Sequence, residues 1–334
     1  MKSPITGKEM KLTKELRSIE FRKETFEIVF HFYKCEDTGE QFTSTELDEL
    51  NMNQVYNQYR DLYNILFPDE IIRIRDKYEL PATKISEILG FGTNGYRLYE
   101  SGEMPSISNA KLIQLADNPQ NFKEMVELCD KLDIKTKIKY IHKADQLIGE
   151  RKKNIFNFNL KDYLLGNHLA DIYSGYRNPN FEKFTEMVVF FSEKLAPFKT
   201  KMNKLLFYSD FLMFKQTCFS ISGVRYRAID KGPVPNNFNS VFEYLTNKEI
   251  IDVNYIQFPQ GYVGEQFKAN KDRSFNSELF DEKELNILIQ VSQKFKDAST
   301  NDMVEMSHLE EAWKQNQMAR KEISYRYAFD LAQL

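Results

Sequence analysis

The sequence predicts a mainly α-helical protein with small β units, a fold of the α+β class. Apolar residues recur at helical spacing over much of the 334-residue chain. Strict two-residue alternation is confined to one segment near the N-terminus, and the aromatic and β-branched segments of the C-terminal half are short. We therefore expect a small N-terminal β-hairpin unit, a five-helix bundle, and a helical C-terminal domain with a short antiparallel sheet.

Composition indicates a cytoplasmic protein without a membrane segment. No apolar stretch reaches the roughly 18 residues that a membrane helix needs, and the N-terminus has no apolar signal core. Cys35, Cys129 and Cys218 are odd in number and far apart, so no disulfide framework is expected. The formal net charge of −3 does not indicate a nucleic-acid binder. The basic excess lies in residues 133–153, with seven basic and three acidic side chains.

Residues 1–67 are expected to form a small β unit followed by a connecting helix. Alternation in residues 26–33 gives a strand one face of which carries four apolar residues, Phe26, Ile28, Phe30 and Phe32. Ile19 and Phe21 supply its partner strand. From Thr43 a capping sequence opens a helix that runs to about Phe67.

Two short knuckles flank this hairpin, Ser3-Pro-Ile-Thr-Gly7 and Cys35-Glu-Asp-Thr-Gly39. Their form resembles the zinc-binding knuckles of MqsA-type antitoxins. The corresponding ligand positions are Ser3, Thr6, Cys35 and Thr38, of which one is a thiol, whereas structural zinc needs about four Cys or His ligands. We expect a zinc-finger fold without metal or other cofactor, in which His31 is an ordinary strand residue.

Residues 68–132 are predicted to form a DNA-binding bundle that begins at Pro68. Within it, residues 80–105 read as a helix, a turn and a second helix, with Gly90 where the first helix must stop. Gly92 or Thr93 could cap the second helix. Two further helices are expected over Ser106–Asp117 and Pro119–Leu132. The candidate DNA-binding residues are Thr93, Asn94 and Arg97.

The run Ile88-Leu-Gly90, Asn94, Tyr99-Glu-Ser-Gly102 and Pro105 resembles the Xre/Cro-type helix-turn-helix, in the version found in MqsA-type antitoxins. The resemblance implies a homodimer on palindromic operator half-sites and a base-reading role for Asn94. The Arg that reads bases in that family would stand at Leu98, one position after Arg97. A helical hairpin without a DNA role is the alternative.

Residues 133–160 are basic and lose strong periodicity, so they are expected to form a linker between domains. Lys135-Thr-Lys-Ile-Lys139 and Arg151-Lys-Lys153 could contact the DNA backbone. A solvated linker without that role is the alternative.

Residues 161–334 are expected to form a separate domain, able to fold alone. Strongly apolar helices are predicted through Phe184–Leu195 and Met202–Leu212, where both should be central in the core. Three strands and two long helices follow, over Phe219–Ile229, Ile250–Phe258, Tyr262–Lys268, Asp281–Phe295 and Thr300–Gln317, with Gly261 in a hairpin turn and another helix near the C-terminus.

Four segments of this half, Lys201–Leu212, Ser222–Ile229, Lys231-Gly-Pro-Val-Pro235 and Ser307–Trp313, follow each other in an order that resembles the Panacea, or SocA-like, antitoxin domain. The resemblance implies a module that binds a toxin protein. Arginine is frequent where interface energy concentrates, and two prolines stiffen the loop beside the predicted strand. The candidate toxin-binding residues are Arg225, Arg227 and Lys231.

Polar residues within these apolar segments permit three interpretations. Asp210, Tyr226 and His308 could form a structural network, belong to a toxin-contact surface, or line a catalytic pocket. No nucleophile elbow, phosphate-binding Gly loop, H-E-x-x-H or Cys-x-x-Cys pattern is present. We therefore expect a structural network and no enzyme.

The leading hypothesis is a type II antitoxin, which holds a toxin through its C-terminal domain and represses its own operon through the helix-turn-helix. A transcriptional regulator that senses a small ligand and has no toxin partner is the alternative, and an enzyme is third. Co-purification with the product of an adjacent gene would distinguish them.

Overall fold

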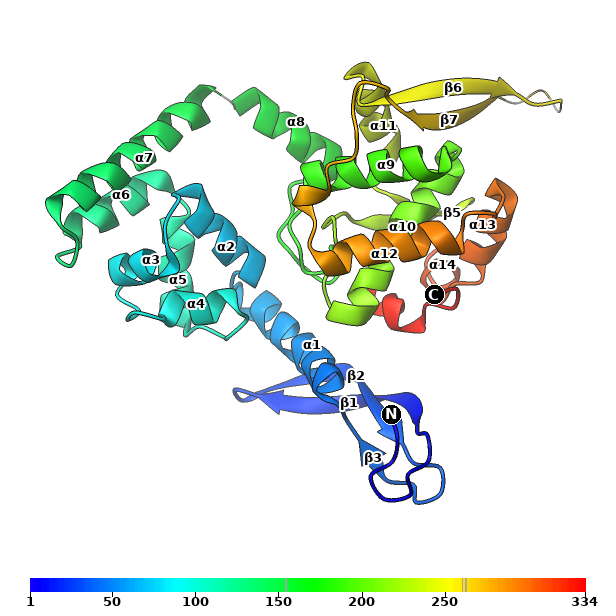
Figure 1. Ribbon diagram of the computed structural model, residues 1–334, viewed down its shortest axis with the longest axis horizontal. Helices are drawn as coiled ribbons and strands as arrows, with labels where there is room; N and C mark the ends of the chain where they lie inside the picture. The colour runs from blue at the N-terminus through cyan, green and yellow to red at the C-terminus, as the bar shows by residue number, and fades with distance from the viewer. Residues whose placement is uncertain (154, 260, 262) are drawn as a thin grey trace. The chain divides into compact units, whose positions relative to one another are not determined.

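The computed structural model describes residues 1–153, 155–259, 261 and 263–334. This described part is mainly helical with small antiparallel sheets, which confirms the predicted α+β class (Figure 1). Contacts divide the chain into two compact units. One combines Met1–Val55 with Lys161–Leu334 and is called the composite unit; the other, Tyr56–Leu160, is called the central unit.

The N-terminal sheet belongs to the composite unit. Its strands are antiparallel in the order β1-β2-β3, with the bounds Lys11–Phe21 (β1), Glu24–Lys34 (β2) and Gln41–Phe42 (β3). Ile19 pairs with Phe26, so the predicted partner strand is confirmed. Phe26, Ile28 and Phe32 are buried, but so is His31 on the opposite face of β2. Both faces of this sheet are therefore partly covered.

Helix α1 (Thr45–Tyr63) is fastened to the open edge of β2 by two side-chain amides. Asn51 accepts a hydrogen bond from the His31 amide at 2.8 Å and donates one to its carbonyl at 2.9 Å. Gln54 forms the same pair of bonds with Val29 at 2.9 and 2.8 Å. These amides take the place of a further strand, and an edge that could otherwise pair with another chain is closed.

The same sheet packs on the last turn of the chain, the 3₁₀-helix η2 (Tyr325–Asp330). The Lys14 ammonium lies 2.6 Å from the Phe329 carbonyl and 2.5 Å from the Asp330 carboxylate. The ring of His31 lies 5.1 Å from that of Phe329. The expected domains 1–67, 68–132, 133–160 and 161–334 therefore differ from the observed units, because the N-terminal segment shares a body with the C-terminal one.

The central unit contains the end of α1 and the predicted bundle. Its helices run over Pro68–Lys77 (α2), Ala82–Leu89 (α3), Gly95–Glu100 (α4), Ile107–Ala116 (α5), Pro119–Leu128 (α6) and Ile134–Lys153 (α7), and α8 (Ile155–Leu165) leads into the composite unit. The ring of Tyr78 stacks on that of Phe122, with ring centres 3.8 Å apart. Buried Arg60 joins α1 to this bundle through a 2.7 Å hydrogen bond from its guanidinium to the Gly102 carbonyl.

Helix α7 occupies most of the segment that was expected to be a linker. Tyr140 and Ala144 are buried in the same hydrophobic cluster as Ile113 and Val126, with Ile141 packed against it. The expectation of a linker without strong periodicity is therefore wrong for this segment. Its apolar stripe is hard to recognise in the sequence, because Ile134 and Ile138 are exposed and stand among lysines.

The rest of the composite unit is built around α10 (Lys199–Thr217), in which every residue from 201 to 214 is buried, as predicted for a central helix. Helices α9 (Phe181–Leu195) and α12 (Glu282–Lys294) pack against it (Figure 1). The remaining elements are Tyr226–Ile229 (β4), Gly232–Pro235 (β5), Phe238–Asn247 (α11), Ile251–Gln257 (β6), Val263–Ala269 (β7), Ser277–Leu279 (η1), Thr300–His308 (α13) and Glu311–Lys314 (α14). None of the described helices is both long and apolar enough to cross a membrane.

Three predicted elements of this half differ from the structure. The strand expected from Phe219 begins only at Tyr226, because the preceding turn gives its amides to the Asp210 carboxylate. The helix expected over 300–317 breaks at Glu310, whose buried carboxylate accepts hydrogen bonds from the Tyr208 hydroxyl and from the Ala332 amide. Tyr262, the expected start of the third strand, lies outside the described residues. Residues 232–235 of the expected loop form strand β5, and Lys231 lies in the turn before it. Helix α11 was not predicted.

Candidate functional sites

The helix-turn-helix of the central unit has the predicted geometry at its turn. Gly90 ends α3 in the left-handed conformation, with φ +76°, a backbone conformation that glycine adopts without steric cost. The Tyr96 amide donates to the Ser86 hydroxyl at 2.8 Å, and the Tyr96 hydroxyl donates to the Ile71 carbonyl at 2.8 Å. One buried tyrosine thus fixes α4 against both α3 and α2.

The three predicted DNA-binding residues, Thr93, Asn94 and Arg97, are all exposed at this corner. Helix α4 begins later than expected, because Gly92 has φ +77° and Asn94, not Gly92 or Thr93, is the N-cap residue. The Asn94 side chain makes no capping hydrogen bond, so its amide is free to contact another molecule. An ion pair of 2.5 Å between Arg75 and Glu100 holds the other end of α4.

The four knuckle positions come together around the Cys35 sulfur. Thr6 Oγ1 lies 3.7 Å from Cys35 Sγ, close to the roughly 3.8 Å that separates two sulfurs of a tetrahedral zinc site. Hydrogen bonds lower the pKa of the Cys35 thiol to about 6, with the largest contribution from Thr38 and smaller ones from Ser3 and Thr6. Hydroxyl groups thus stabilise the thiolate where the zinc-binding knuckles have a metal. Within the described part of the chain, no cluster of three or more His, Cys, Asp or Glu could hold an ion.

We expect purified protein to contain no stoichiometric zinc, and a chelator to leave its melting temperature unchanged, because one thiolate cannot hold the ion. The matched control is the triple variant Ser3→Cys, Thr6→Cys and Thr38→Cys, which places four thiols at the same positions. That variant should take up zinc and lose thermal stability when a chelator is added. One zinc per unmodified chain in elemental analysis would contradict the prediction.

Asp210 and Tyr226, two residues of the predicted network, meet in the core of the composite unit. One carboxylate oxygen of Asp210 accepts hydrogen bonds from the Ile221 and Ser222 amides, each at 2.8 Å. The other accepts from the Ser222 hydroxyl at 2.6 Å and from the Tyr226 hydroxyl at 2.7 Å. Burial raises the pKa of the Asp210 carboxyl, while these donors oppose that rise. The carboxylate is inaccessible to solvent and joins α10 to β4.

His308, the third predicted network residue, lies in a different contact. Its ring stacks on Trp313, with ring centres 3.7 Å apart, and its Nε2 lies 3.1 Å from the Asp230 carbonyl. Trp313 Nε1 donates to the Ile229 carbonyl at 2.8 Å. These two side chains therefore hold the turn between β4 and β5.

A buried lysine, Lys204, which was not among the predicted site residues, supports the same turn. Lys204 Nζ donates to the Pro233 carbonyl at 2.8 Å, and burial lowers the pKa of this lysine to about 7. Gly232 has φ +97°, and a Cβ atom there would lie 2.3 Å from the Ser307 hydroxyl, so only glycine fits. The sequence signal that could have identified Lys204 is the presence of a lysine in the middle of an otherwise apolar helix.

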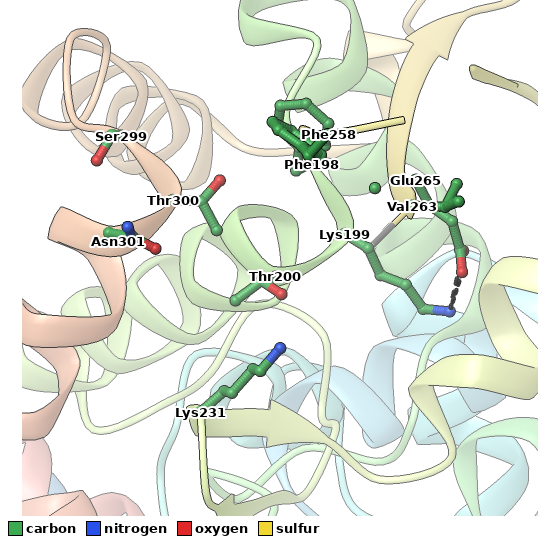
Figure 2. Close-up of a pocket in the computed structure, with 11 residues that line it drawn as sticks. Phe198, Lys199, Thr200, Lys231, Phe258, Val263, Glu265, Ser299, Thr300 and Asn301 are labelled. Atoms are coloured by element: carbon green, nitrogen blue, oxygen red, sulfur yellow. Dashed lines mark hydrogen bonds and ion pairs between the residues drawn. The ribbon is translucent and has the colours of Figure 1, made fainter. Parts of the chain in front are cut away.

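A cavity of about 520 Å³ opens beside this turn (Figure 2). Its lining comes from the start of α10, the start of α13, the β4–β5 turn and the β6–β7 hairpin. The lining residues are Phe198, Lys199, Thr200, Lys231, Phe258, Val263, Gly264, Glu265, Ser299, Thr300 and Asn301. Of these, Lys231 alone was predicted as a site residue from the sequence, because the others lie far apart in the chain and show no common pattern.

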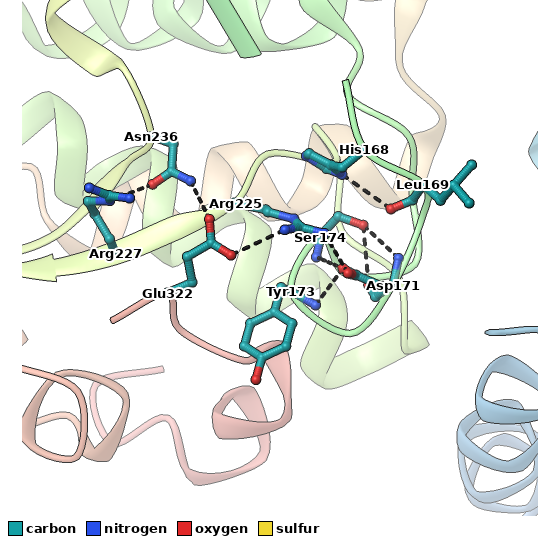
Figure 3. Close-up of polar contacts among 9 residues, drawn as sticks. All are labelled: His168, Leu169, Asp171, Tyr173, Ser174, Arg225, Arg227, Asn236 and Glu322. Atoms are coloured by element: carbon teal, nitrogen blue, oxygen red, sulfur yellow. Dashed lines mark hydrogen bonds and ion pairs between the residues drawn. The ribbon is translucent and has the colours of Figure 1, made fainter. Parts of the chain in front are cut away.

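The predicted toxin-binding arginines are part of a chain of polar contacts (Figure 3). The Arg225 guanidinium lies 2.5 Å from Asp171 and 3.2 Å from Glu322. Arg227 Nε donates to the Asn236 side-chain oxygen at 2.9 Å, and Asn236 donates to Glu322 at 2.7 Å. Arg225 is thus held by two carboxylates, whereas the Arg227 side chain is exposed. Tyr226 points the opposite way, into the core, as the strand alternation predicts.

Comparison with protein families finds two matches. Residues 1–126 match the family described as the antitoxin component of bacterial toxin-antitoxin systems, MqsA. Residues 202–314 match the family described as antitoxin SocA-like, Panacea domain. No curated protein matches the sequence. Both resemblances expected from the sequence are confirmed, and both families consist of antitoxins.

Proposed function

The chain joins an MqsA-type antitoxin domain to a SocA-like Panacea domain, and from this premise we propose that it neutralises a toxin protein by direct binding and represses its own operon. The observation that carries the proposal is the presence of both antitoxin domains in one chain. An antitoxin implies a toxin partner. The composite unit would hold the toxin, and the central unit would bind operator DNA.

DNA binding is supported by the exposed corner of the helix-turn-helix. Thr93, Asn94 and Arg97 lie there without engaging the rest of the bundle, while Tyr96 fixes the helix behind them. The bundle is slightly acidic, with 8 basic and 11 acidic side chains over residues 68–132. Because phosphate neutralisation supplies most non-specific affinity, we expect stable binding only when a homodimer contacts two half-sites of a palindromic operator.

Toxin binding is assigned to the surface around the β4–β5 hairpin. Arg227 and Lys231 are exposed at its two ends, and both can contact a partner. Arg225 was predicted to contact the toxin directly. Because Asp171 and Glu322 hold its guanidinium, we propose that it also positions this surface. A surface that is ordered before binding loses less entropy when the partner arrives.

No catalytic role is proposed. The polar groups that could have served one, Asp210 and Tyr226, bond to each other and to backbone amides inside the core. A cytoplasmic location fits an antitoxin that acts on an operon and on its toxin. A transcriptional regulator that senses a small ligand is the alternative, and the cavity beside Lys231 is the observation that favours it.

The test is growth rescue by the full chain co-expressed with the product of the adjacent gene. We expect the unmodified chain and the Asn94→Ala, Arg97→Ala double variant to rescue growth, because DNA contacts are not needed to hold the toxin. The Arg227→Ala, Lys231→Ala double variant should rescue less well while still repressing a reporter fused to the operon promoter. If the adjacent product is not toxic, or is not held by the unmodified chain, the antitoxin assignment fails and the ligand-sensing regulator becomes the better explanation.

A further inference from the structure

The cavity beside the β4–β5 turn has two chemically different sides (Figure 2). Phe198 and Phe258 form an apolar side, with ring centres 5.5 Å apart and the Gly264 backbone against both rings. The other side carries the hydroxyl groups of Thr200 and Thr300. A ligand that fits both must combine an apolar part with a polar group.

Lys231 gives the cavity a positive charge that is not neutralised within the described structure. Other lysines nearby are engaged: Lys199 pairs with Glu265 at 3.0 Å, Lys201 donates to the Ala298 carbonyl at 2.6 Å, and Lys204 donates to the Pro233 carbonyl at 2.8 Å. Lys231 has no hydrogen-bond or ion-pair partner among residues 1–153, 155–259, 261 and 263–334. Its side chain points from the turn toward Thr200 (Figure 2). A cation in a concave, partly apolar site favours an anion.

The polar surroundings of Lys231 can donate further hydrogen bonds. Thr200 and Thr300 place hydroxyl groups at the cavity wall, and Phe198, the N-cap residue of α10, offers no side-chain acceptor to the first turn of that helix. An oxygen acceptor placed between Lys231 and Thr200 would therefore meet donors on two elements. Glu265 at the rim is paired with Lys199, which leaves the charge of Lys231 to be matched, and a singly charged carboxylate matches it better than a doubly charged phosphate.

We propose that this cavity receives an acidic side chain of the toxin, with its carboxylate at Lys231 and Thr200 and an adjacent apolar side chain against Phe198 and Phe258. The inference rests on the proposed antitoxin function. A toxin segment fits better than a free metabolite because the cavity lies at one end of the β4–β5 hairpin whose other end carries Arg227, so one partner surface could contact both. An anchor residue in a concave site is a usual centre of binding energy in protein interfaces.

The test measures the affinity of the full chain for its purified toxin. Lys231→Met should weaken binding by about 10- to 100-fold, because it leaves the toxin carboxylate buried without its cation. Lys231→Arg should bind within about threefold of the unmodified chain, since the charge is kept. Phe258→Ala should weaken binding through loss of the apolar side. Lys283→Met is the matched control, because Lys283 is an exposed lysine on α12 without a described partner, and its loss should change nothing. Thermal melting of each variant checks that the fold is intact.

Charge reversal locates the toxin residue. Lys231→Glu should abolish binding, and replacing the correct Asp or Glu of the toxin by Lys should restore it. Unchanged affinity in both Lys231→Met and Phe258→Ala would overturn the inference while leaving the antitoxin function intact. Thermal stabilisation of the toxin-free chain by phenylacetate that Lys231→Met abolishes, together with unchanged toxin affinity, would overturn it in favour of a free acid. Absence of toxin binding by the unmodified chain would refute both the proposed function and this inference.

Discussion

Asp210→Ala is expected to lower the free energy of unfolding of the composite unit by about 3–5 kcal/mol. The substitution removes the acceptor for the amides of Ile221 and Ser222 and for the hydroxyls of Ser222 and Tyr226, all in the core. Buried donors without acceptors keep their full desolvation cost. Because the lost acceptor joins α10 to β4, toxin neutralisation should fall together with stability.

Asp210→Asn is the informative comparison. Its amide oxygen can still accept from the two backbone amides, while its NH₂ group must donate to the hydroxyls, which can rotate to accept. We therefore expect a smaller loss than for Asp210→Ala. The surface control is Asp162→Ala, which removes an exposed carboxylate from α8. Chemical denaturation of the three variants measures the difference; equal midpoints for Asp210→Ala and Asp162→Ala would show that the network is not structural.

Asn94→Ala is expected to cost about 1–3 kcal/mol of binding free energy on the operator and little on random DNA. The reason is that Asn94 is exposed at the start of α4 with no capping hydrogen bond, so its amide can form a two-bond contact with adenine. Titration of the full chain on both DNA sequences at fixed salt gives the difference. Equal losses on the two sequences would leave Asn94 as a residue that positions the helix.

Arg97→Ala distinguishes two roles for the exposed arginine one turn along α4. If Arg97 reads bases, the loss is confined to operator DNA. If it contacts phosphate, the loss is similar on both sequences and the salt dependence of binding becomes shallower. Tyr96→Phe is the control, because it removes the bond to the Ile71 carbonyl without touching the exposed face. It should affect stability more than sequence preference.

Sequence patterns predicted the structural features that depend on residues close together in the chain. Gly90 ends a helix because it alone adopts the left-handed conformation at no cost, and Tyr96 is buried because it lies on the apolar face of a short helix. The knuckle positions were predicted to belong together, and the structure brings Ser3, Thr6 and Thr38 to Cys35. At the helix-turn-helix corner, sequence spacing predicted that Thr93, Asn94 and Arg97 are exposed, although α4 begins later than expected.

Contacts between distant segments could not be predicted in this way. Lys14 and Asp330 are 316 positions apart, and no sequence pattern indicates that they pair. The helix break at Glu310 depends on the Ala332 amide and the Tyr208 hydroxyl, so a helical pattern through it was misleading. The cavity residues Phe198, Thr200 and Thr300 likewise come together only in the fold.

The division of the composite unit between the two ends of the chain has a consequence for its synthesis. Residues 1–55 leave the ribosome first, but their partner segment begins at Lys161 and its last contacts are made by η2. At a synthesis rate of about 5–20 residues per second, tens of seconds pass between the synthesis of the N-terminal hairpin and that of Phe329, whose ring packs against His31. The central unit, continuous in sequence, can fold during that interval. We therefore expect a nascent or prematurely terminated chain to fold the central unit, which we propose binds operator DNA, before the composite unit, which we propose holds the toxin. An incompletely translated chain would then repress the operon without neutralising the toxin.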